Sequence, residues 1–314
     1  FVFGIALMYG ATGTTALPAM VAELGEATPL ALAGIAFLLV GFGFKIAAVP
    51  FQMWTPDVYE GAPTSVTAFM SVGAKVGGFA AMLRIFLIAL PNLGDAWVPA
   101  IAVMSALTLI IGNVAAISQH NIKRLLGYSS IAHAGFILIA VAATANSDSG
   151  LSAALFYMFA YLFTNLGAFA IVIAMERKLG EGVMLEDYKG LAKEHTWLAL
   201  AMTLFMLSLA GVPPTIGFTA KFYVFRAAVE AELVWLAIIG VVTSVVSAFY
   251  YLRVVYYMFM FDGEAQPMQR PALTTAMVIT AVVVFLFGIL PAWGWDIANE
   301  AVFQSVQSLA ALGG

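Results

Sequence analysis

The chain alternates between long apolar runs and short polar segments that contain glycine, proline and asparagine. A hydrocarbon core of about 30 Å requires about 20 apolar residues per helix, and this length divides the chain into candidate membrane helices. We expect the first, 1–11, to be a partial helix and the others to be full spans. The full spans cover 30–58, 63–90, 97–118, 122–143, 151–176, 196–230, 233–260 and 272–291. The pattern predicts an all-α polytopic membrane protein.

Capping and turn residues support these boundaries. Thr28 followed by Pro29 is typical of a helix start, and Gly61-Ala62-Pro63 is typical of a turn before a new helix. The segment 146–150 has the composition of a loop. The last segment, 297–312, is short and mixed in polarity, so we expect it to lie at the membrane interface.

Composition confirms the membrane class and limits the chemistry. The chain is 63% hydrophobic and 10% charged, whereas soluble domains have roughly 45–50% and 25%. A net charge of −4 without a basic patch excludes nucleic acid as a partner. The absence of cysteine excludes disulfides, thiolate-bound zinc and iron–sulfur clusters, and three scattered histidines predict no metal site. We therefore expect no cofactor in this chain and place any redox chemistry in other chains.

The beginning of the sequence and its basic loops give two further expectations. Phe1 lies within an apolar run, without an initiator methionine or a signal peptide, so we expect the chain to be the C-terminal part of a longer subunit. Alternate loops are rich in basic residues, and the positive-inside rule places them in the cytoplasm. These residues are Lys123, Arg124, Arg177, Lys178, Lys189, Lys193 and Arg270, against only Arg84 and Arg226 on the other side. Arg253, near a helix end, is expected to extend to the interface.

Lys45, Lys75 and Lys221 stand inside apolar spans that contain no acidic residue to pair with them. A lone charge in hydrocarbon costs about 2.5–3.5 kcal/mol on insertion scales, so each is a candidate functional site. Burial disfavours the charged form of a lysine, and a moving counter-charge can therefore switch its proton affinity. The chain has no phosphate-binding loop for ATP, so uphill proton movement would need a driver elsewhere.

Prolines near two of these lysines predict broken helices. Pro50 should open its helix at the carbonyl of Ile46, one residue after Lys45, and Pro213-Pro214 should interrupt the long span that contains Lys221. Kinks that serve packing alone remain an alternative for Pro50. Extension of the side chain to the membrane surface remains an alternative for Lys75 and, more seriously, for Lys221.

Polar residues in the span 122–143 lie between the two groups of lysines. His133 could be a proton relay or a hydrogen-bonded core histidine, and Ser129 and Ser130 lie one turn before it. Lys123 and the neighbouring Arg124 are explained by the positive-inside signal, with a relay role as the alternative. Asp57 and Glu60 indicate a cytoplasmic turn near a possible entry funnel.

Four motifs carry a resemblance over nearly the whole chain: GFKIAAVPFQMWTPDVYEGAP, AKVGGFAAMLRIF, NIKRLLGYSSIAHAGF and SLAGVPPTIGFTAKFYVF. They resemble the subunit N family of bacterial NADH-quinone oxidoreductase, respiratory complex I, the counterpart of mitochondrial NADH dehydrogenase subunit 2. The resemblance implies an antiporter-like bundle with two inverted repeats, each containing a broken helix. On this basis 1–90 would end the first repeat, 97–260 would form the second, and 272–314 would be a terminal helix and interfacial tail of a single domain, 1–314.

The resemblance also implies roles. Lys45, Lys75 and Lys221 match the family's proton-translocating lysines, and Lys123 and His133 match polar positions on its central hydrophilic axis. The glutamate partner of the first lysine would lie on an earlier helix, outside this sequence. Flavin, iron–sulfur clusters and quinone would be bound by other subunits, which with the lipid of the bacterial inner membrane are the implied partners.

Two departures and two rivals qualify this picture. Gln52 stands where the family favours histidine, and Ala220 where it favours glycine, but neither change removes a lysine. One rival is a subunit of a multisubunit cation/proton antiporter, against which WTPDVYEGAP argues. The other is a structural membrane spacer that moves no ions.

Overall fold

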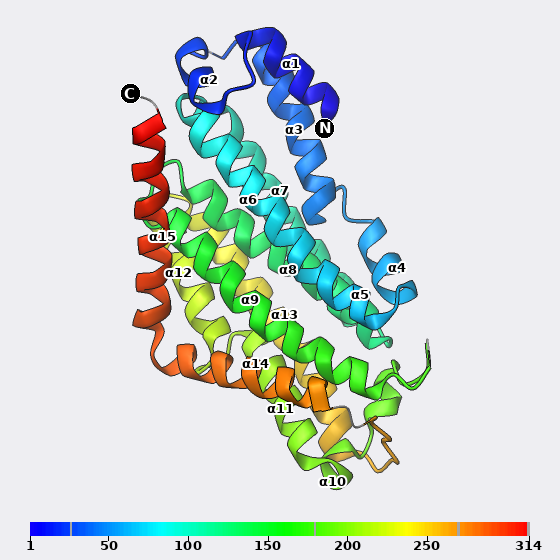
Figure 1. Cartoon of the computed structure of the whole chain (residues 1–314). Helices are drawn as coiled ribbons and strands as arrows, with labels where there is room; N and C mark the ends of the chain where they lie inside the picture. The colour runs from blue at the N-terminus through cyan, green and yellow to red at the C-terminus, as the bar shows by residue number, and fades with distance from the viewer. Residues whose placement is uncertain (26, 179, 269–270, 313–314) are drawn as a thin grey trace.

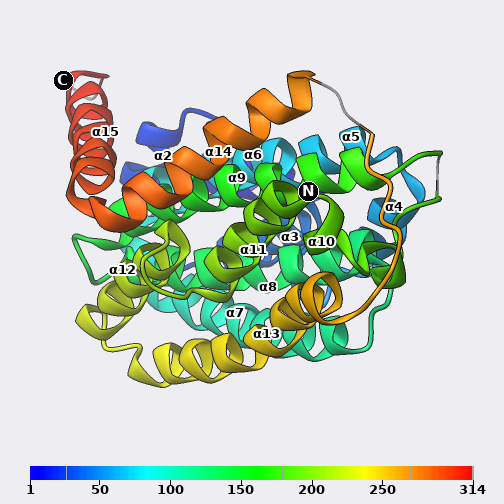
Figure 2. The ribbon, with the colours of Figure 1, turned by 90° about the horizontal axis from the view of Figure 1, so that it is seen from below.

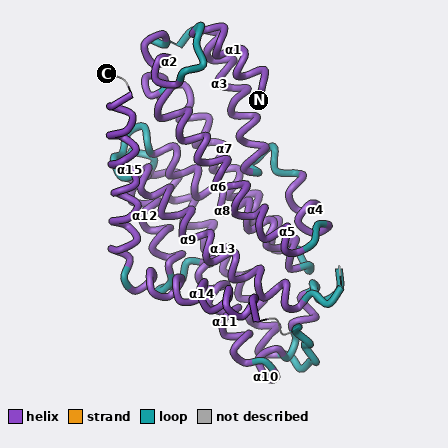
Figure 3. The backbone as a smooth tube through the Cα atoms, in the orientation of Figure 1, coloured by secondary structure: helices purple, strands orange, loops and turns teal. Residues whose placement is uncertain are grey.

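The computed structural model describes residues 1–25, 27–178, 180–268 and 271–312, and no strand occurs among them (Figure 3). The helices before the central region are α1 (Val2–Thr12), α2 (Leu17–Glu23), α3 (Pro29–Ile46), α4 (Trp54–Gly61), α5 (Thr64–Phe69) and α6 (Lys75–Arg84). Those that follow are α7 (Gly94–Ile117), α8 (Ile122–Ala143), α9 (Gly150–Met175), α10 (Leu191–Glu194), α11 (Thr196–Ala210), α12 (Ile216–Glu230), α13 (Val234–Met260), α14 (Pro271–Ile289) and α15 (Pro291–Leu312). The expected all-α membrane fold is confirmed.

Seven helical segments in the described part of the chain are long and apolar enough to cross a membrane. They correspond to the predicted spans apart from 1–11 and 196–230. The latter is divided into α11 and α12 of 15 residues each, which are too short to cross singly. At the N-terminus, α1 and the unpredicted α2 are bent by 51°.

Helix α8 lies at the centre of the bundle (Figures 1 and 2). It packs against α7, α9, α12, α4 and α13. All of its residues except Arg124 and Tyr128 are buried, whereas α14 buries only Thr280 and Val284. An apolar helix that is enclosed on all sides is typical of a bundle centre, and one exposed on most sides is typical of a lipid-facing position.

Close approach of α7 to α8 depends on glycine. A side chain at Gly112 would stand 2.8 Å from the backbone nitrogen of Ala132, and one at Gly135 would stand 2.8 Å from Leu109. Small residues at such contacts allow membrane helices to pack at short distance. The pair α7 and α8 therefore forms a tight unit onto which the other helices pack.

The first predicted break occurs at the position that Pro50 indicates. Helix α3 ends at Ile46, Ala47 takes a left-handed conformation, and α4 begins at Trp54. The open segment is held by side chains: Thr108 of α7 accepts a hydrogen bond from the Val49 amide, and the Trp54 indole donates to the Phe44 carbonyl. Irregular backbone at membrane depth is tolerated where such partners replace the helical bonds.

The second predicted break separates α11 from α12. Helix α11 ends at Ala210, Gly211 has φ 87°, and Pro213-Pro214 precede α12. The Ser208 hydroxyl accepts a hydrogen bond from the Gly217 amide across the break. Both breaks leave carbonyl groups at the C-terminal end of a half-helix, which carries partial negative charge.

The span predicted over 63–90 contains two unpredicted π-helical turns, at Met70–Ala74 and Ile85–Ala89. The first ends immediately before Lys75. In that turn the Asn165 amide of α9 donates to the Ser71 hydroxyl at 2.7 Å. Such π turns are rare and frequently occur at functional sites.

The predicted cytoplasmic loops contact one another at one end of the bundle. Arg124 binds both Asp57 and Glu60, at 2.6 and 2.9 Å, and the Ile122 amide donates to the Val183 carbonyl. At the same end Lys193 pairs with Asp262, which lowers the pKa of that carboxyl. Arg270 lies outside the described residues. The predicted grouping of these loops therefore agrees with their contacts.

The Arg253 guanidinium donates to the carbonyls of Ile117 and Gln119 at the C-terminal end of α7, next to the basic loop that begins α8. Cationic side chains commonly satisfy the free carbonyls at helix ends. Its extension to the membrane interface stays a prediction. The terminal helix α15 runs across the direction of the other helices (Figure 2).

Candidate functional site

Lys75 is buried and has no acidic partner among the described residues. Its side chain is 4% exposed, and its ammonium donates to the Ser130 carbonyl of α8 at 2.5 Å. The extension to the membrane surface considered from the sequence is therefore not what the structure shows. A charge removed from water and held by a single carbonyl is poorly compensated, and such a group exchanges its proton readily when a better site is offered.

Lys221 is also buried, 4% exposed, and is held in a related way. Its ammonium reaches back across the break to the last carbonyls of α11, those of Leu209 at 3.1 Å and Ala210 at 2.8 Å. It also lies 4.8 Å from the centre of the Phe136 ring of α8. The partial negative charge of a helix C-terminus and a cation–π contact thus take the place of a carboxylate.

His133 lies on α8 between these two lysines. Its Nδ1 is 2.8 Å from the Tyr157 hydroxyl and its Nε2 is 3.1 Å from the Tyr251 hydroxyl. Tyr251 in turn bonds to Ser129. With both ring nitrogens bonded to hydroxyls that can donate or accept, the imidazole can pass a proton between them by changing tautomer.

One face of α8 connects the lysine sites. Ser130, His133 and Phe136 follow at intervals of three residues, so they lie on one side of the helix. The Ser130 hydroxyl is also 3.4 Å from that of Tyr59. The contact of Lys75 with Ser130 and that of Lys221 with Phe136 lie six residues apart, about 9 Å along the helix. The buried polar groups around His133, which we call the His133 path, thus lie between two cationic groups.

Lys45 differs from the other two lysines. Although it lies in the last turn of α3, its side chain is exposed on the surface of this chain, and it has no ion pair among the described residues. Its stem packs toward α6, where a side chain at Gly78 would stand 3.2 Å from it. The expectation of a buried lysine beside Pro50 is therefore wrong within this chain, because no described helix covers that side of α3.

Lys123 forms a buried ion pair that the sequence did not indicate. It is 1% exposed, its ammonium donates to the Ala62 carbonyl at 2.6 Å, and it lies 3.6 Å from a carboxylate oxygen of Glu176. Glu176 directly follows α9, so these contacts join α4, α8 and α9. A residue that obeys the positive-inside pattern therefore also belongs to the interior.

The sequence analysis did not identify the buried tyrosines near α8. Tyr59, Tyr157, Tyr161 and Tyr251 come from three helices, and all four are buried. Tyrosine in a membrane span has a common apolar use, so its presence gave no signal. These tyrosines differ from others only in that they face α8, and this is known only once the packing of the helices is known.

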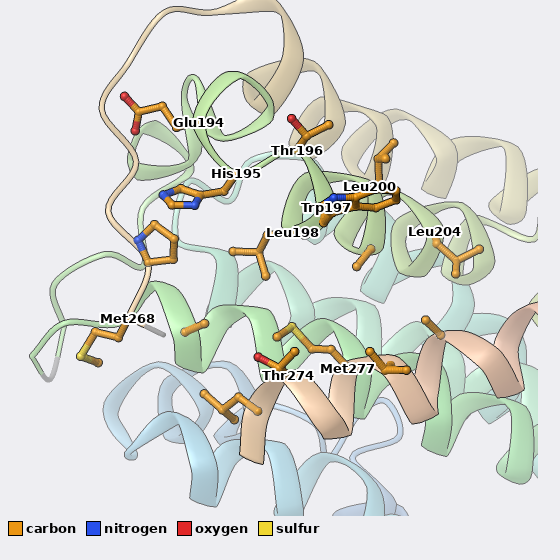
Figure 4. Close-up of a pocket in the computed structure, with 16 residues that line it drawn as sticks. Glu194, His195, Thr196, Trp197, Leu198, Leu200, Leu204, Met268, Thr274 and Met277 are labelled. Atoms are coloured by element: carbon orange, nitrogen blue, oxygen red, sulfur yellow. The ribbon is translucent and has the colours of Figure 1, made fainter. Parts of the chain in front are cut away.

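A hollow of about 800 Å³ lies away from this path (Figure 4). It is an apolar groove between α11 and α14, with Glu194 and His195 at one end and Trp197 beside Leu200. Among the described residues no group of three or more histidine, aspartate or glutamate side chains could hold a metal ion. The buried polar groups described above are hydroxyl, imidazole and amine groups, which are able to exchange protons.

Comparisons with known proteins agree with this description. A family model described as "NADH:quinone oxidoreductase/Mrp antiporter, TM" matches residues 1–247. NADH-quinone oxidoreductase subunit N 1 of Herpetosiphon aurantiacus is 51% identical over 313 residues, which cover 96% of this chain and 63% of that protein.

Two solved structures share the fold. A chain of respiratory complex I from Thermus thermophilus matches with a TM-score of 0.81 at 38% identity, covering 94% of this chain and 64% of that chain. A chain of the Mrp complex from Dietzia sp. matches with a TM-score of 0.87 at 23% identity, covering 100% of this chain and 67% of that chain, and this likeness concerns the fold alone.

The chain spans less than two thirds of the length of the curated relatives that head the comparison. The family model, however, covers most of the chain, and the resemblance drawn from the sequence motifs is confirmed. By its fold, its two broken helices and this match, the chain belongs to the transmembrane family shared by NADH:quinone oxidoreductase and Mrp antiporter subunits.

Proposed function

We propose that the chain is subunit N of a bacterial NADH-quinone oxidoreductase and conducts protons across the inner membrane. The observation that carries this proposal is the position of Lys75 and Lys221, both buried without a carboxylate, at the two ends of the His133 path. Relatives that are 45–51% identical and carry the name subunit N support the choice of complex.

In the proposed mechanism the lysines exchange protons through α8. The carbonyl of Ser130 and those at the end of α11 stabilise an ammonium but carry only partial charge, so either lysine can release its proton. His133 and its two tyrosines conduct the proton between them. Each charge that crosses 100 mV requires about 2.3 kcal/mol, so the driving force must come from electron transfer in other subunits.

Lys45 enters the proposal as a third proton site with a partner from elsewhere. Lys45 is exposed and belongs to the last turn of α3, at the first break, whereas Lys221 binds the last carbonyls of α11 at the second break. We assign the counter-charge of Lys45 to a carboxylate outside these 314 residues, as the family resemblance implied. Lys123 belongs to the same proton route. It lies in the first turn of α8, at the end of the bundle that carries the basic loops.

The division into repeats is part of this proposal. Residues 1–90 would end one inverted repeat and 97–260 would form the second, because a broken helix with its own lysine lies in each. The segment 272–314 would be the terminal helix and a tail at the interface, which the crossing direction of α15 supports (Figure 2). NADH oxidation with flavin and iron–sulfur clusters, and quinone reduction, would occur in partner subunits.

Replacing Lys75 by alanine tests the proposal in the assembled complex. Proton pumping and quinone reductase turnover should both fall by about tenfold or more, since a positioned proton-transfer group contributes roughly 10²–10⁴-fold. The control is Lys193→Ala, which removes an exposed lysine outside the membrane spans and should change neither rate. Wild-type pumping and turnover in Lys75→Ala would favour the structural spacer instead.

The cation/proton antiporter alternative shares the fold but makes a different prediction about partners. A tagged chain purified from its native membrane should bring with it flavin and iron–sulfur proteins. Copurification of antiporter subunits in their place would exclude complex I.

A further inference from the structure

A small polar hollow opens at the end of the bundle where the basic loops meet. Its volume is about 220 Å³, and it lies between the start of α5 and the segment that follows α9. Thr64 and Ser65 line one side, and Glu176, Arg177 and Lys178 line the other. A water molecule occupies about 30 Å³ in the liquid, so the hollow has room for several.

The residues that line the hollow differ in their access to water. The Thr64 side chain is 1% exposed, and its hydroxyl, which has no hydrogen-bond partner among the described residues, is closed to solvent. Arg177 and Lys178 are exposed, and 13% of the Glu176 side chain is accessible. Water can therefore reach the Glu176 carboxylate from the side of the hollow that these three residues line.

Glu176 connects the hollow to the interior. It lines the hollow, yet its carboxylate lies 3.6 Å from the buried ammonium of Lys123. That ammonium donates to the Ala62 carbonyl, two residues before Thr64. The Glu176 carboxylate thus lies between the hollow and the buried ammonium of Lys123.

From Lys123 the same face of α8 leads to the lysine path. Ser130 lies seven residues after Lys123, which is nearly two full turns, so both residues are on one side of the helix. Tyr59 covers this face: its ring stands 3.5 Å from the position of a side chain at Gly127, and its hydroxyl is 3.4 Å from that of Ser130. The backbone carbonyl of Ser130, next to this hydroxyl, accepts the hydrogen bond from Lys75.

Other charged or titratable groups surround this carboxylate on each side. Arg177 and Lys178 follow it in the chain and are exposed, and Glu60 acts on Lys123 from α4. Tyr188 is buried nearby, and its pKa is raised by burial first and then by the charges of Asp187 and Glu176. Among these groups Glu176 alone both lines the hollow and contacts Lys123.

We propose that Glu176 is the entry group for protons on the side of the basic loops, an inference that rests on the proposed function. A proton from water in the hollow binds the Glu176 carboxylate and breaks the ion pair. Lys123 then releases its own proton toward Ser130 and Lys75. The Glu176 carboxyl returns its proton to the neutral Lys123 amine, and the ion pair forms again with one proton moved inward.

Lys123→Arg separates this relay from a structural ion pair. Arginine keeps the positive charge and can bind both Glu176 and the Ala62 carbonyl, but it does not lose its proton in proteins. A relay predicts that pumping per assembled complex falls by about tenfold or more. The matched control is Lys193→Arg, the same change in the exposed pair with Asp262, which should leave pumping unchanged.

Glu176→Gln is the second variant and decides the question if Lys123→Arg does not assemble. Glutamine keeps the shape and an oxygen for Lys123 but cannot take up a proton, so pumping should fall similarly. Glu176→Asp should restore part of it. The amount of assembled complex is measured by NADH oxidation with an artificial electron acceptor.

The outcomes distinguish the two proposals when Lys75→Ala is measured in the same membranes. Loss of pumping in Lys75→Ala, Glu176→Gln and Lys123→Arg supports the entry route. Loss in Lys75→Ala with wild-type pumping in Lys123→Arg, or in Glu176→Gln, overturns the entry route and leaves the proposed function standing. Wild-type pumping in Lys75→Ala overturns the proposed function.

Discussion

At the scale of single residues, the buried amines are held by groups that cannot themselves be titrated. Lys75 and Lys221 bind backbone carbonyls, whose partial charges stay fixed when a proton arrives or leaves. A carboxylate would hold the ammonium more firmly, because it carries a full negative charge whereas a carbonyl oxygen carries only a partial one. Weak, constant partners suit a group that has to change its protonation state.

The hydrogen bond from His133 to Tyr157 can be tested against a matched tyrosine. Tyr157→Phe should lower stability by about 1 kcal/mol, since it removes one buried hydrogen bond and leaves an imidazole nitrogen unpaired. Tyr161 lies one turn further along α9, with its ring centre 4.9 Å from that of His133 and tilted by 32°, but its hydroxyl has no partner in hydrogen-bonding geometry among the described residues.

The change Tyr161→Phe should therefore leave stability nearly unchanged. The midpoint of thermal unfolding in detergent measures both variants, and proton pumping should follow the same order. Equal effects of the two changes would show that the His133–Tyr157 bond contributes nothing.

At this scale the sequence identified the cationic groups but not their partners. An uncompensated lysine in an apolar run is visible without a structure, and so is a histidine in mid-span. The exposure of Lys45 could not be predicted, since it depends on which helix covers that side of α3. The Glu176–Lys123 pair joins residues 53 positions apart, which no local pattern reveals.

At the scale of elements, the two broken helices share one plan. In each, a half-helix ends at a residue in the left-handed region. The lysines differ: Lys45 precedes the first break and is exposed, whereas Lys221 follows the second break and binds the final carbonyls of α11.

Gly211 tests how closely the second break fits its lysine. It has φ 87°, and a side chain there would stand 2.8 Å from Cδ of Lys221. Gly211→Ala should therefore cost the backbone strain of a left-handed alanine, about 1–2 kcal/mol, and also displace Lys221 from its carbonyls.

Gly13→Ala is the matched control for this change. Gly13 has φ 69° with no atom within 4 Å, so alanine there carries the backbone strain alone. We expect similar losses of thermal stability in the two variants but reduced proton pumping only in Gly211→Ala. Normal pumping in Gly211→Ala would show that the position of Lys221 is not critical.

Proline made both breaks predictable, since it removes a backbone donor and clashes with the carbonyl four residues earlier. Helix α3 accordingly ends at Ile46. The π-helical turn before Lys75 was not predictable, because its residues, Met70–Ala74, contain no proline and would fit an ordinary helix. Its stabilising contact, Asn165 with Ser71, comes from a distant helix.

At the scale of the whole molecule, the loops divide into two groups at opposite ends of the bundle. One end carries the Arg124 cluster with Asp57 and Glu60. At the other, Ser147 and Ser149 bind Glu230 at the end of α12. Segment lengths and basic residues were sufficient to predict this division, because successive spans must alternate in direction.

Labelling of introduced cysteines tests the orientation, and the chain has no cysteine of its own. Lys178→Cys should react with a membrane-impermeant maleimide in inside-out vesicles, and Asp148→Cys in right-side-out vesicles. Both positions are exposed. The chain is then isolated by an affinity tag and its label is counted. The reverse pattern would invert the orientation and place the Glu176 hollow on the outer side.

The burial of α8 has a consequence for biosynthesis. This helix leaves the ribosome before α9, α12 and α13, which later enclose it, so Ser129, Ser130 and His133 first meet lipid or the insertion machinery. Its mean hydropathy of 1.8 is nevertheless within the range of the lipid-exposed helices of the chain. The apolar half that follows His133 offsets the polar half before it, and α8 can therefore enter the bilayer before its partners exist.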